Sequence, residues 1–239
     1  MCSSDLPATV GESEFLEVIY ISPASFVDLS GCRFTAGIDY VFPSETILAP
    51  GARLTVSAGQ FLNATALSNG GERLTLEAPG GVIIKSFSYS DAPPWPVQPD
   101  GFGPSLVLIA PATNPDHSLA VNWRSSIAPG GNPGMDDAVH FTGSPTGDDD
   151  GDGWSNLVEY ALGPDPAITY SQTLDGLTFI LPRVENADDA VIAGEVSTAL
   201  TGWTAADLIS STSTTLTFRV PASMAGQGRL FIRGTVQLR

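Results

Sequence analysis

The sequence predicts an all-β protein that consists of a β-sandwich, an acidic loop with one short helix, and a second small β-domain. The composition supports this fold class, because only 15% of the 239 residues are charged while 25 are Gly and 19 are Pro. Such a composition favours strands joined by turns over long surface helices. Short apolar stretches also alternate with turn residues. A single stretch of helical character follows the acidic loop.

Candidate strands occur about every 8–15 residues in the first half of the chain. They are Glu14–Ile21, Cys32–Thr35, Tyr40–Phe42, Arg53–Ala58, Arg73–Ala78, Val82–Tyr89 and Ser105–Ala110. In Arg53–Ser57 and in Arg73–Glu77 every second residue is apolar, which is typical of a strand with one buried face. Pro79-Gly80-Gly81 separates two of these strands and is a hairpin signal. About seven strands at this spacing predict a β-sandwich.

The strongest chemical signal is the stretch Asp148–Glu159, which reads DDDGDGWSNLVE. It fits the pattern D-x-[DN]-x-[DN]-G-x5-E of a loop that binds one calcium ion, with Gly153 at the sharp turn. Calcium takes roughly six to eight oxygen ligands, and carboxylates this close together repel one another unless a cation lies between them. The predicted ligands are Asp148, Asp150, Asp152, the backbone carbonyl of Trp154, Asn156 and Glu159.

The acidic charge is concentrated around this loop. Residues 136–166 contain eight acidic and no basic residues, and so carry half of the net charge of −16. A solvated acidic linker is the alternative interpretation, because most acidic runs are only that. The fixed Gly153, the terminal Glu159 and the helix-like NLVEYAL, which Gly163 ends, favour a cation site. Asp165 is a candidate outer ligand.

A single loop followed by one helix differs from a signalling EF-hand. The approach to the loop, FTGSPTG, is rich in Gly, Pro and small polar residues, so no entering helix is expected. The stretch Asp148–Pro166 resembles the EF-hand-like, thrombospondin type 3-like calcium repeats of bacterial extracellular proteins, of the DxDGDGxxNxxEYxLGxDP kind. The resemblance implies one bound Ca²⁺ and an extracellular or cell-surface location.

Five pieces of the first half occur in an order that resembles the lamin-tail domain of bacterial secreted and surface proteins. They are VDLSGCRFT (27–35), LSNGGERL (67–74), PWP (94–96), SLVLI (105–109) and the closing NWR…PGGNPG (122–134). The resemblance implies an immunoglobulin-like sandwich without catalytic residues, which acts in attachment or as an adaptor. Cys32 departs from the pattern, because an aromatic Trp is frequent there, and we expect a buried, inert thiol.

We therefore predict four segments. Residues 11–135 form the lamin-tail-like immunoglobulin-fold sandwich, 136–147 a linker, 148–166 the calcium loop with its helix, and 167–239 a small C-terminal β-domain. The strands expected in the last segment are Leu177–Leu181, Ala190–Ser197, Thr215–Val220 and Arg229–Leu238. So short a segment with few strands has a marginal core. We expect it to pack on the calcium segment, with the ion fixing the junction.

Several function classes are disfavoured. The longest apolar runs fall short of the roughly eighteen residues of a membrane span. Nucleic-acid binding requires basic patches, whereas the chain has one Lys (Lys85) and nine scattered Arg. His117 and His140 belong to no catalytic or zinc motif. These histidines, with Asp136 and Asp137, are expected to be solvated loop residues. A carboxylate pair for glycoside hydrolysis is left open.

The prominent aromatic and basic side chains are assigned structural roles. Trp95 and Trp123 are predicted to cap the sandwich core, the alternative being an exposed ligand platform. Arg73 and Arg124 are predicted to pair at the surface or at strand ends, the alternative being contacts with an acidic partner. Cys2–Leu6 resembles translated sequencing adapter, so we expect that a true start with its export signal is missing.

The function predicted from these observations is a non-catalytic extracellular or cell-surface calcium-binding module for recognition or tethering. Its expected partners are a calcium ion and an unidentified protein or cell-surface ligand, without nucleic acid and without a membrane span. The alternative is an accessory, substrate-binding portion of a truncated larger secreted hydrolase or nuclease. A free-standing enzyme is not expected.

Overall fold

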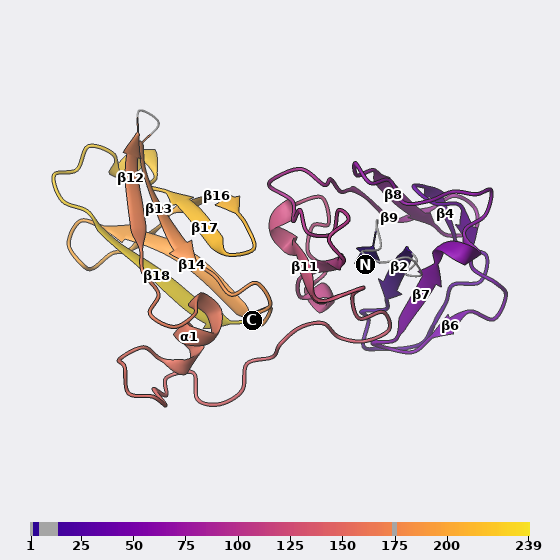
Figure 1. Cartoon of the computed structure of the whole chain (residues 1–239), viewed down its shortest axis with the longest axis horizontal. Helices are drawn as coiled ribbons and strands as arrows, with labels where there is room; N and C mark the ends of the chain where they lie inside the picture. The colour runs from indigo at the N-terminus through magenta and orange to yellow at the C-terminus, as the bar shows by residue number, and fades with distance from the viewer. Residues whose placement is uncertain (1, 5–13, 174–175) are drawn as a thin grey trace. The chain divides into compact units, whose positions relative to one another are not determined.

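The computed structural model describes residues 2–4, 14–173 and 176–239 (Figure 1). Residues 11–13 of the predicted sandwich, and residues 5 and 6 of the adapter-like stretch, lie outside the described residues. The chain divides into two compact units, Met1–Asp137 and Ala138–Arg239. Strands dominate both units and the described residues contain one α-helix, which confirms the all-β prediction. No helix among the described residues has the length and apolar character needed to cross a membrane.

The first unit contains two larger antiparallel sheets. One sheet has the strand order β11-β10-β1-β2-β7 and the other has the order β5-β4-β8-β9, while β3 and β6 form a separate pair. The strands are β1 (Cys2–Ser4), β2 (Phe15–Ile19), β3 (Val27–Asp28), β4 (Arg33–Ala36), β5 (Tyr40–Val41), β6 (Ile47–Leu48), β7 (Arg53–Ser57), β8 (Arg73–Glu77), β9 (Ile83–Ser88), β10 (Pro104–Leu108) and β11 (Trp123–Pro129). Short 3₁₀ turns lie at Ala58–Gln60, Pro111–Thr113 and Ala120–Asn122.

Both larger sheets contribute side chains to one core. Leu16, Val56 and Leu106 come from the first sheet, and Phe34 and Leu74 come from the second. Alternate residues of an antiparallel strand point to the same face, so these side chains fill the space between the two layers. The predicted packing of the tryptophans is confirmed. Trp123 is buried in this core, and the Trp95 ring packs against the Trp123 ring with a centroid distance of 6.0 Å.

The outer face of β2 is also covered. The Glu17 carboxylate is 3% exposed and accepts hydrogen bonds from Arg53 Nη1 at 2.7 Å and from the Gly134 backbone N–H. A Cβ atom at Gly131 would collide with the Ser105 side chain and approach the Phe15 ring, so this position has room only for glycine. The segment after β11 therefore packs on the sheet as part of the first unit.

The second unit is a pair of antiparallel sheets with α1 (Asn156–Leu162) against one end. The strand orders are β12-β13-β17-β16 and β15-β14-β18. The strands are β12 (Thr169–Thr173), β13 (Gly176–Pro182), β14 (Ala190–Ser197), β15 (Thr204–Ala205), β16 (Asp207–Ser211), β17 (Thr215–Arg219) and β18 (Phe231–Leu238), and a 3₁₀ turn lies at Ala222–Met224. The expectation of few strands was wrong, because β12, β15 and β16 add to the four that were predicted.

Two glycines let the sheets of the second unit approach closely. Gly194 and Gly234 are direct partners in the ladder between β14 and β18. A Cβ atom at Gly194 would lie 2.6 Å from the Phe179 ring and 2.8 Å from the Phe218 ring, and one at Gly234 would lie 2.9 Å from Leu181. The side chains of Phe179, Phe218 and Leu181 on the facing sheet therefore occupy the space that a side chain at position 194 or 234 would need.

The predicted linker 136–147 is divided between the units. Asp136 and Asp137 belong to the first unit, where Asp137 is buried. Residues 139–141 contact the second unit: the Val139 N–H donates to the Asn186 carbonyl at 3.3 Å and the Phe141 N–H donates to Asp189 Oδ2 at 2.8 Å. The buried Asp137 side chain on one side of the unit boundary and the hydrogen bonds of Val139 and Phe141 on the other therefore fix this segment.

Candidate metal centre

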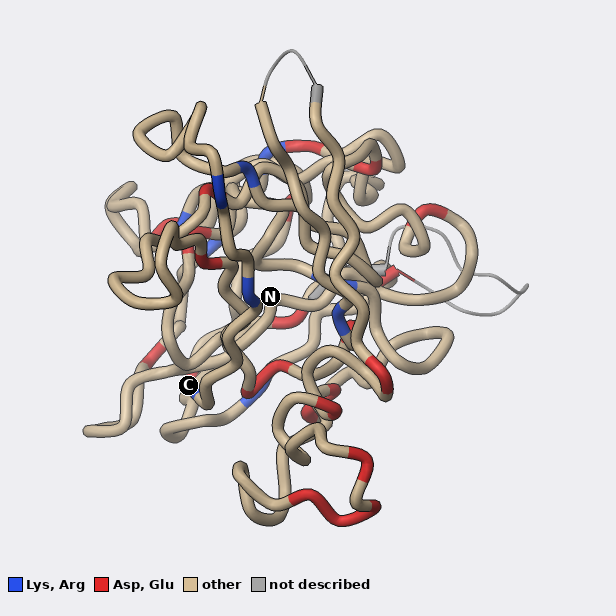
Figure 2. The backbone as a smooth tube through the Cα atoms, turned by 90° about the vertical axis from the view of Figure 1, so that its left-hand side faces the viewer, with Lys and Arg blue, Asp and Glu red and all other residues tan. Residues whose placement is uncertain are grey.

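The acidic loop lies directly before α1, and the helix anchors it to the second unit. Figure 2 shows acidic residues gathered on this loop without a basic residue among them. The helix begins after Ser155 and ends at Gly163, whose φ of 85° suits glycine. The Val184 N–H donates to the Ala161 carbonyl at 2.8 Å, and Ala161 and Leu162 pack against Ala190. The loop is thus attached to a packed helix rather than to a free tether.

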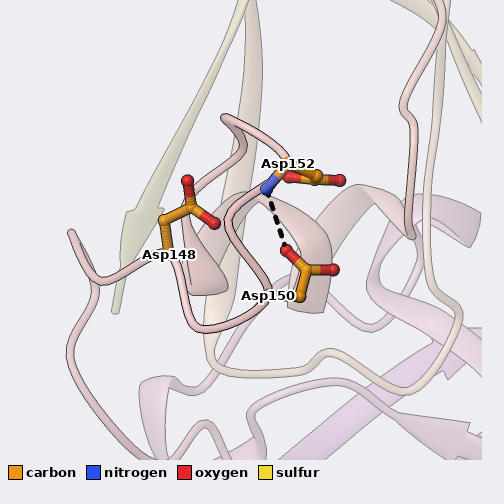
Figure 3. A group of neighbouring side chains, drawn as sticks. All are labelled: Asp148, Asp150 and Asp152. Carbon is orange, nitrogen blue, oxygen red and sulfur yellow. Dashed lines mark hydrogen bonds between the residues drawn. The ribbon is translucent and has the colours of Figure 1, made fainter.

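The loop is folded by hydrogen bonds from its own backbone to its aspartates. Asp148 accepts from the Gly151 N–H at 2.7 Å and from the Gly153 N–H at 3.0 Å. Asp150 accepts from the Asp152 N–H at 3.2 Å (Figure 3). Asp152 accepts from the Trp154 N–H at 2.8 Å. Gly151 and Gly153 have φ of 79° and 99°, which glycine adopts without strain. The sequence pattern therefore produces a tight loop in which three carboxylates point toward one region.

Three of the predicted ligands converge. One carboxylate oxygen each from Asp148, Asp150 and Asp152 lies within 4.8 Å of the other two, and all three residues are exposed to solvent. At this separation three negative charges repel one another, and a divalent cation between them removes the repulsion. Oxygen atoms are the donors that calcium prefers, so the type and spacing of these groups fit that ion.

Glu159 is close enough to the three aspartates for their negative charges to affect its pKa. Partial desolvation raises the pKa of the Glu159 carboxyl above its ordinary value, and the negative charges of Asp150, Asp152 and Asp148 raise it further. Glu159 is the last residue of the loop and lies in the first turn of α1. Among the described residues the converging group contains only the three aspartates, so the ligand role of Glu159 stays a prediction.

The other two predicted ligands have defined neighbours. The Trp154 N–H is hydrogen-bonded to Asp152, and the Trp154 side chain is 41% exposed. The Asn156 side chain holds the two arms of the loop together, since its Oδ1 accepts from the Asp149 N–H at 3.1 Å and its Nδ2 donates to the Ser144 carbonyl at 3.4 Å. The structure thus shows Asn156 closing the loop, and ligation by Asn156 or by the Trp154 carbonyl remains predicted.

Two groups expected to be solvated are buried instead. His117 is 7% exposed and packs against the rings of Phe87 and Trp123 at centroid distances of 5.1 and 5.9 Å. Asp137 is buried and forms an ion pair with Arg124. The expectation failed for both because strands pack against these loop residues: β9 and β11 against His117, and β11 against Asp137. Arg124 pairs as predicted, but in the interior rather than at the surface.

The predictions for His140, Arg73 and Cys32 agree with the structure. His140 is exposed, with Nδ1 2.9 Å from Asp189 Oδ1. Arg73 donates from Nε to Ser86 Oγ at 3.0 Å on the neighbouring strand. Cys32 is a buried free thiol, and burial raises its pKa, which makes it a poor nucleophile. None of these side chains belongs to the converging acidic group.

Comparisons of the chain with protein-family models, with curated proteins and with solved structures give no match. The interpretation of the loop therefore depends on its donor atoms and geometry. Sequence reasoning did not single out Lys85, which lines a cavity of the first unit. The available signal was that Lys85 is the only lysine in the chain.

Proposed function

We propose that this protein is a non-catalytic extracellular or cell-surface module that binds one calcium ion in the loop 148–159 and serves in recognition or tethering. In this proposal the first unit is an immunoglobulin-like sandwich of the lamin-tail type, and it carries the surface for a protein or cell-surface ligand. The second unit supplies the calcium loop. The convergence of the Asp148, Asp150 and Asp152 carboxylates within 4.8 Å is the observation that carries the proposal.

The electrostatics of the loop favour a bound cation. The loop Asp148–Glu159 has five acidic residues and no basic one, so no cationic side chain of the loop itself relieves their repulsion. The three aspartates supply oxygen donors, and the Trp154 carbonyl, Asn156 and Glu159 are the proposed remaining ligands. A bound divalent ion would neutralise these charges where they now repel one another.

The helix after the loop gives calcium a structural role. Ala161 and Leu162 of α1 pack against Ala187 and Ala190, and Val158 lies beside the same cluster. An ion that ties Glu159 to the loop would fix the first turn of α1, which would in turn hold the loop against the sheet of β14 and β18. The proposed consequence is a stiffer second unit rather than a chemical reaction.

Calcium titration of the full chain tests this proposal. A single loop outside an EF-hand pair has an expected Kd of roughly 10⁻⁴–10⁻³ M. Calcium at about ten times Kd stabilises the folded state by about 1.4 kcal/mol, which raises the unfolding temperature by several degrees. Isothermal titration calorimetry measures Kd, and thermal unfolding with calcium or with EDTA measures the stabilisation.

A matched pair of variants separates a cation site from a general acidic surface. Asp150→Asn removes one converging carboxylate and should weaken calcium binding at least about tenfold. Asp149→Asn removes the same charge from the adjacent residue, which is outside the converging group, and should weaken it much less. Equal losses in the two variants, or no heat of binding at about 10 mM calcium, would rule out the proposed site.

A further inference from the structure

A cavity of about 290 Å³ lies in the first unit, and no residue of the acidic loop lines it. Strands from both larger sheets line it: Val18 of β2 and Leu108 of β10 on one side, and Leu76 of β8 and Ile84 of β9 on the other. Most of the lining side chains are apolar. Cavities that accept small molecules have walls of this kind, with a few polar groups that fix the orientation of the ligand.

Lys85 is the charged group of the cavity and the only lysine of the chain. Its Nζ donates a hydrogen bond to Asn114 Oδ1 at 2.8 Å. Within residues 2–4, 14–173 and 176–239, no carboxylate oxygen lies within the 4.0 Å of an ion pair with Lys85. A lysine ammonium has three donors, so donors remain for a further acceptor.

A short turn holds Asn114, the hydrogen-bond acceptor of the Lys85 ammonium, in place. Asn114 ends the 3₁₀ turn Pro111–Thr113, and its backbone N–H donates to the Pro111 carbonyl at 3.0 Å. Both Pro111 and Asn114 line the cavity together with Lys85. The amide acceptor is therefore placed before any ligand binds, which lowers the entropy cost of ordering the lysine in a complex.

His117 also lines the cavity, and its imidazole is uncharged at neutral pH. Burial lowers its pKa to about 4, and the positive charge of Lys85 contributes to the lowering. Its Nδ1 lies 2.7 Å from the Pro115 carbonyl oxygen, which can only accept, so Nδ1 carries the proton and Nε2 is a bare acceptor. The cavity thus contains a single net positive charge.

We propose that this cavity binds a small amphipathic carboxylate, with its apolar body against the aliphatic walls and its carboxylate on the Lys85 ammonium beside Asn114. An organic cation would meet the like charge of Lys85. A neutral apolar ligand would desolvate the ammonium without giving it an acceptor, which is unfavourable. Inorganic phosphate usually requires several basic donors, and this cavity has one.

The volume sets the size of the ligand. A cavity of about 150 Å³ holds one benzene molecule, and this cavity is about twice as large. An acid with one aromatic ring and a short alkyl linker, such as 3-phenylpropanoate, is therefore the appropriate probe. The proposal extends beyond calcium binding, because the cavity and the acidic loop share no residue.

The test compares three ligands of one shape on the full chain in phosphate-free buffer: 3-phenylpropanoate, 3-phenylpropan-1-ol and 3-phenylpropan-1-amine. Binding is followed by methyl and aromatic NMR shifts and by calorimetry. We expect saturable binding of the acid with shifts at Ile84, Leu108 and His117. The alcohol should bind about tenfold more weakly or worse, because it lacks the charge-assisted hydrogen bond. The amine should bind weakest.

Variants of the two cations on the β8–β9 hairpin give the matched control. Lys85→Gln should abolish the preference for acid over alcohol while the alcohol still binds. Arg73→Gln removes a cation that contacts Ser86 and does not line the cavity, so the preference should survive. Asn114→Ala should weaken the acid selectively. Equal binding of acid and alcohol to the unaltered chain, shifts confined to other residues, or a preference that persists in Lys85→Gln would overturn the proposal.

Discussion

The Arg124 guanidinium and the Asp137 carboxylate form a buried ion pair, with Nη1 2.5 Å from Oδ2 and side chains that are 1% and 5% exposed. The Ile127 N–H also donates to Asp137 Oδ2, at 3.0 Å. The pair joins β11 to the segment that follows it, at the last residue of the first unit. Removal of one partner from such a pair leaves the other charge buried without compensation.

We predict that Asp137→Ala lowers the free energy of unfolding of the first unit by about 3–5 kcal/mol. Urea unfolding of the full chain measures the change. The control is Asp136→Ala, because Asp136 is adjacent but 56% exposed and contacts Arg53 at 3.7 Å. An exposed pair of this kind contributes about 1 kcal/mol or less. Similar losses in the two variants would show that the ion pair does not stabilise the unit.

A second prediction concerns the close approach of the sheets in the second unit. Gly194→Ala introduces a methyl group 2.6 Å from the Phe179 ring, so the two facing aromatic rings must move. Overpacking of this kind costs about 1–3 kcal/mol, measurable as a lower unfolding temperature of that unit. Gly228→Ala is the control, because its Cβ atom would have no neighbour within 4 Å. A fully stable Gly194→Ala variant would contradict the described packing.

His117 makes the stability of the first unit dependent on pH. Burial lowers its pKa from 6.5 to about 4 in the folded protein. Between these values the unfolded chain binds a proton that the folded chain does not, so stability is complete above about pH 6.5 and falls as the pH decreases toward 4. The loss between pH 7 and pH 5 amounts to about 2 kcal/mol.

Urea unfolding at pH 7 and pH 5 checks this expectation. Other carboxylates also titrate in this range, so the informative quantity is the difference between the unaltered chain and His117→Gln, in which this contribution is absent. His140→Gln removes the exposed histidine and should retain the acid-side loss. The interpretation would fail if His117→Gln lost as much stability on acidification as the unaltered chain.

The role of Asn156 in closing the acidic loop gives a prediction for calcium affinity. Asn156→Ala removes the bonds to Asp149 and Ser144 and should raise the calcium Kd by about 10–100-fold, as is usual for residues that position metal ligands. Gly147→Ala should have a similar effect, because its Cβ atom would lie 2.8 Å from Asn156 Nδ2.

Ser144→Ala is the control for this experiment, since Ser144 contacts Asn156 through its backbone carbonyl and would keep that contact. Calorimetry gives the affinity of each variant. Unchanged affinity in both Asn156→Ala and Gly147→Ala would mean that the closed form of the loop is not the one that binds calcium.

Local sequence patterns predicted the helices and strands that have a regular spacing of apolar residues. The helix Asn156–Leu162 and the strand Ala190–Ser197 have the predicted bounds. Both could be predicted because the apolar stripe of a helix, its terminal glycine and the apolar residues of a strand are all recognised within a short stretch of sequence. The seven strands expected between residues 14 and 110 all occur as β2, β4, β5, β7, β8, β9 and β10, with ends that differ by a few residues.

Two of the missed strands, β11 and β12, contain several polar residues. The strand β11 contains Arg124, Ser125 and Ser126, which are buried although their types favour the surface. Their burial depends on acceptors elsewhere: Asp137 for Arg124, and the Gln98 side chain for Ser125. The strand β12, TYSQT, likewise pairs along its whole length with β13. The partners of β11 lie on other segments, and β12 is a strand through its ladder with the next strand, so the polar residues of either segment give no apolar pattern from which to predict it.

The sequence by itself determined the all-β class, the helix and its stop at Gly163, and the order of acidic residues that lets one short loop carry three aspartates. Only the tertiary structure decided that Asp148, Asp150 and Asp152 converge, that His117 and Asp137 are buried, and that Lys85 lines an apolar cavity without a carboxylate partner among the described residues. The physical reason is that backbone conformation follows neighbouring residues, whereas the burial and charge environment of a side chain follow from the strands that fold against it.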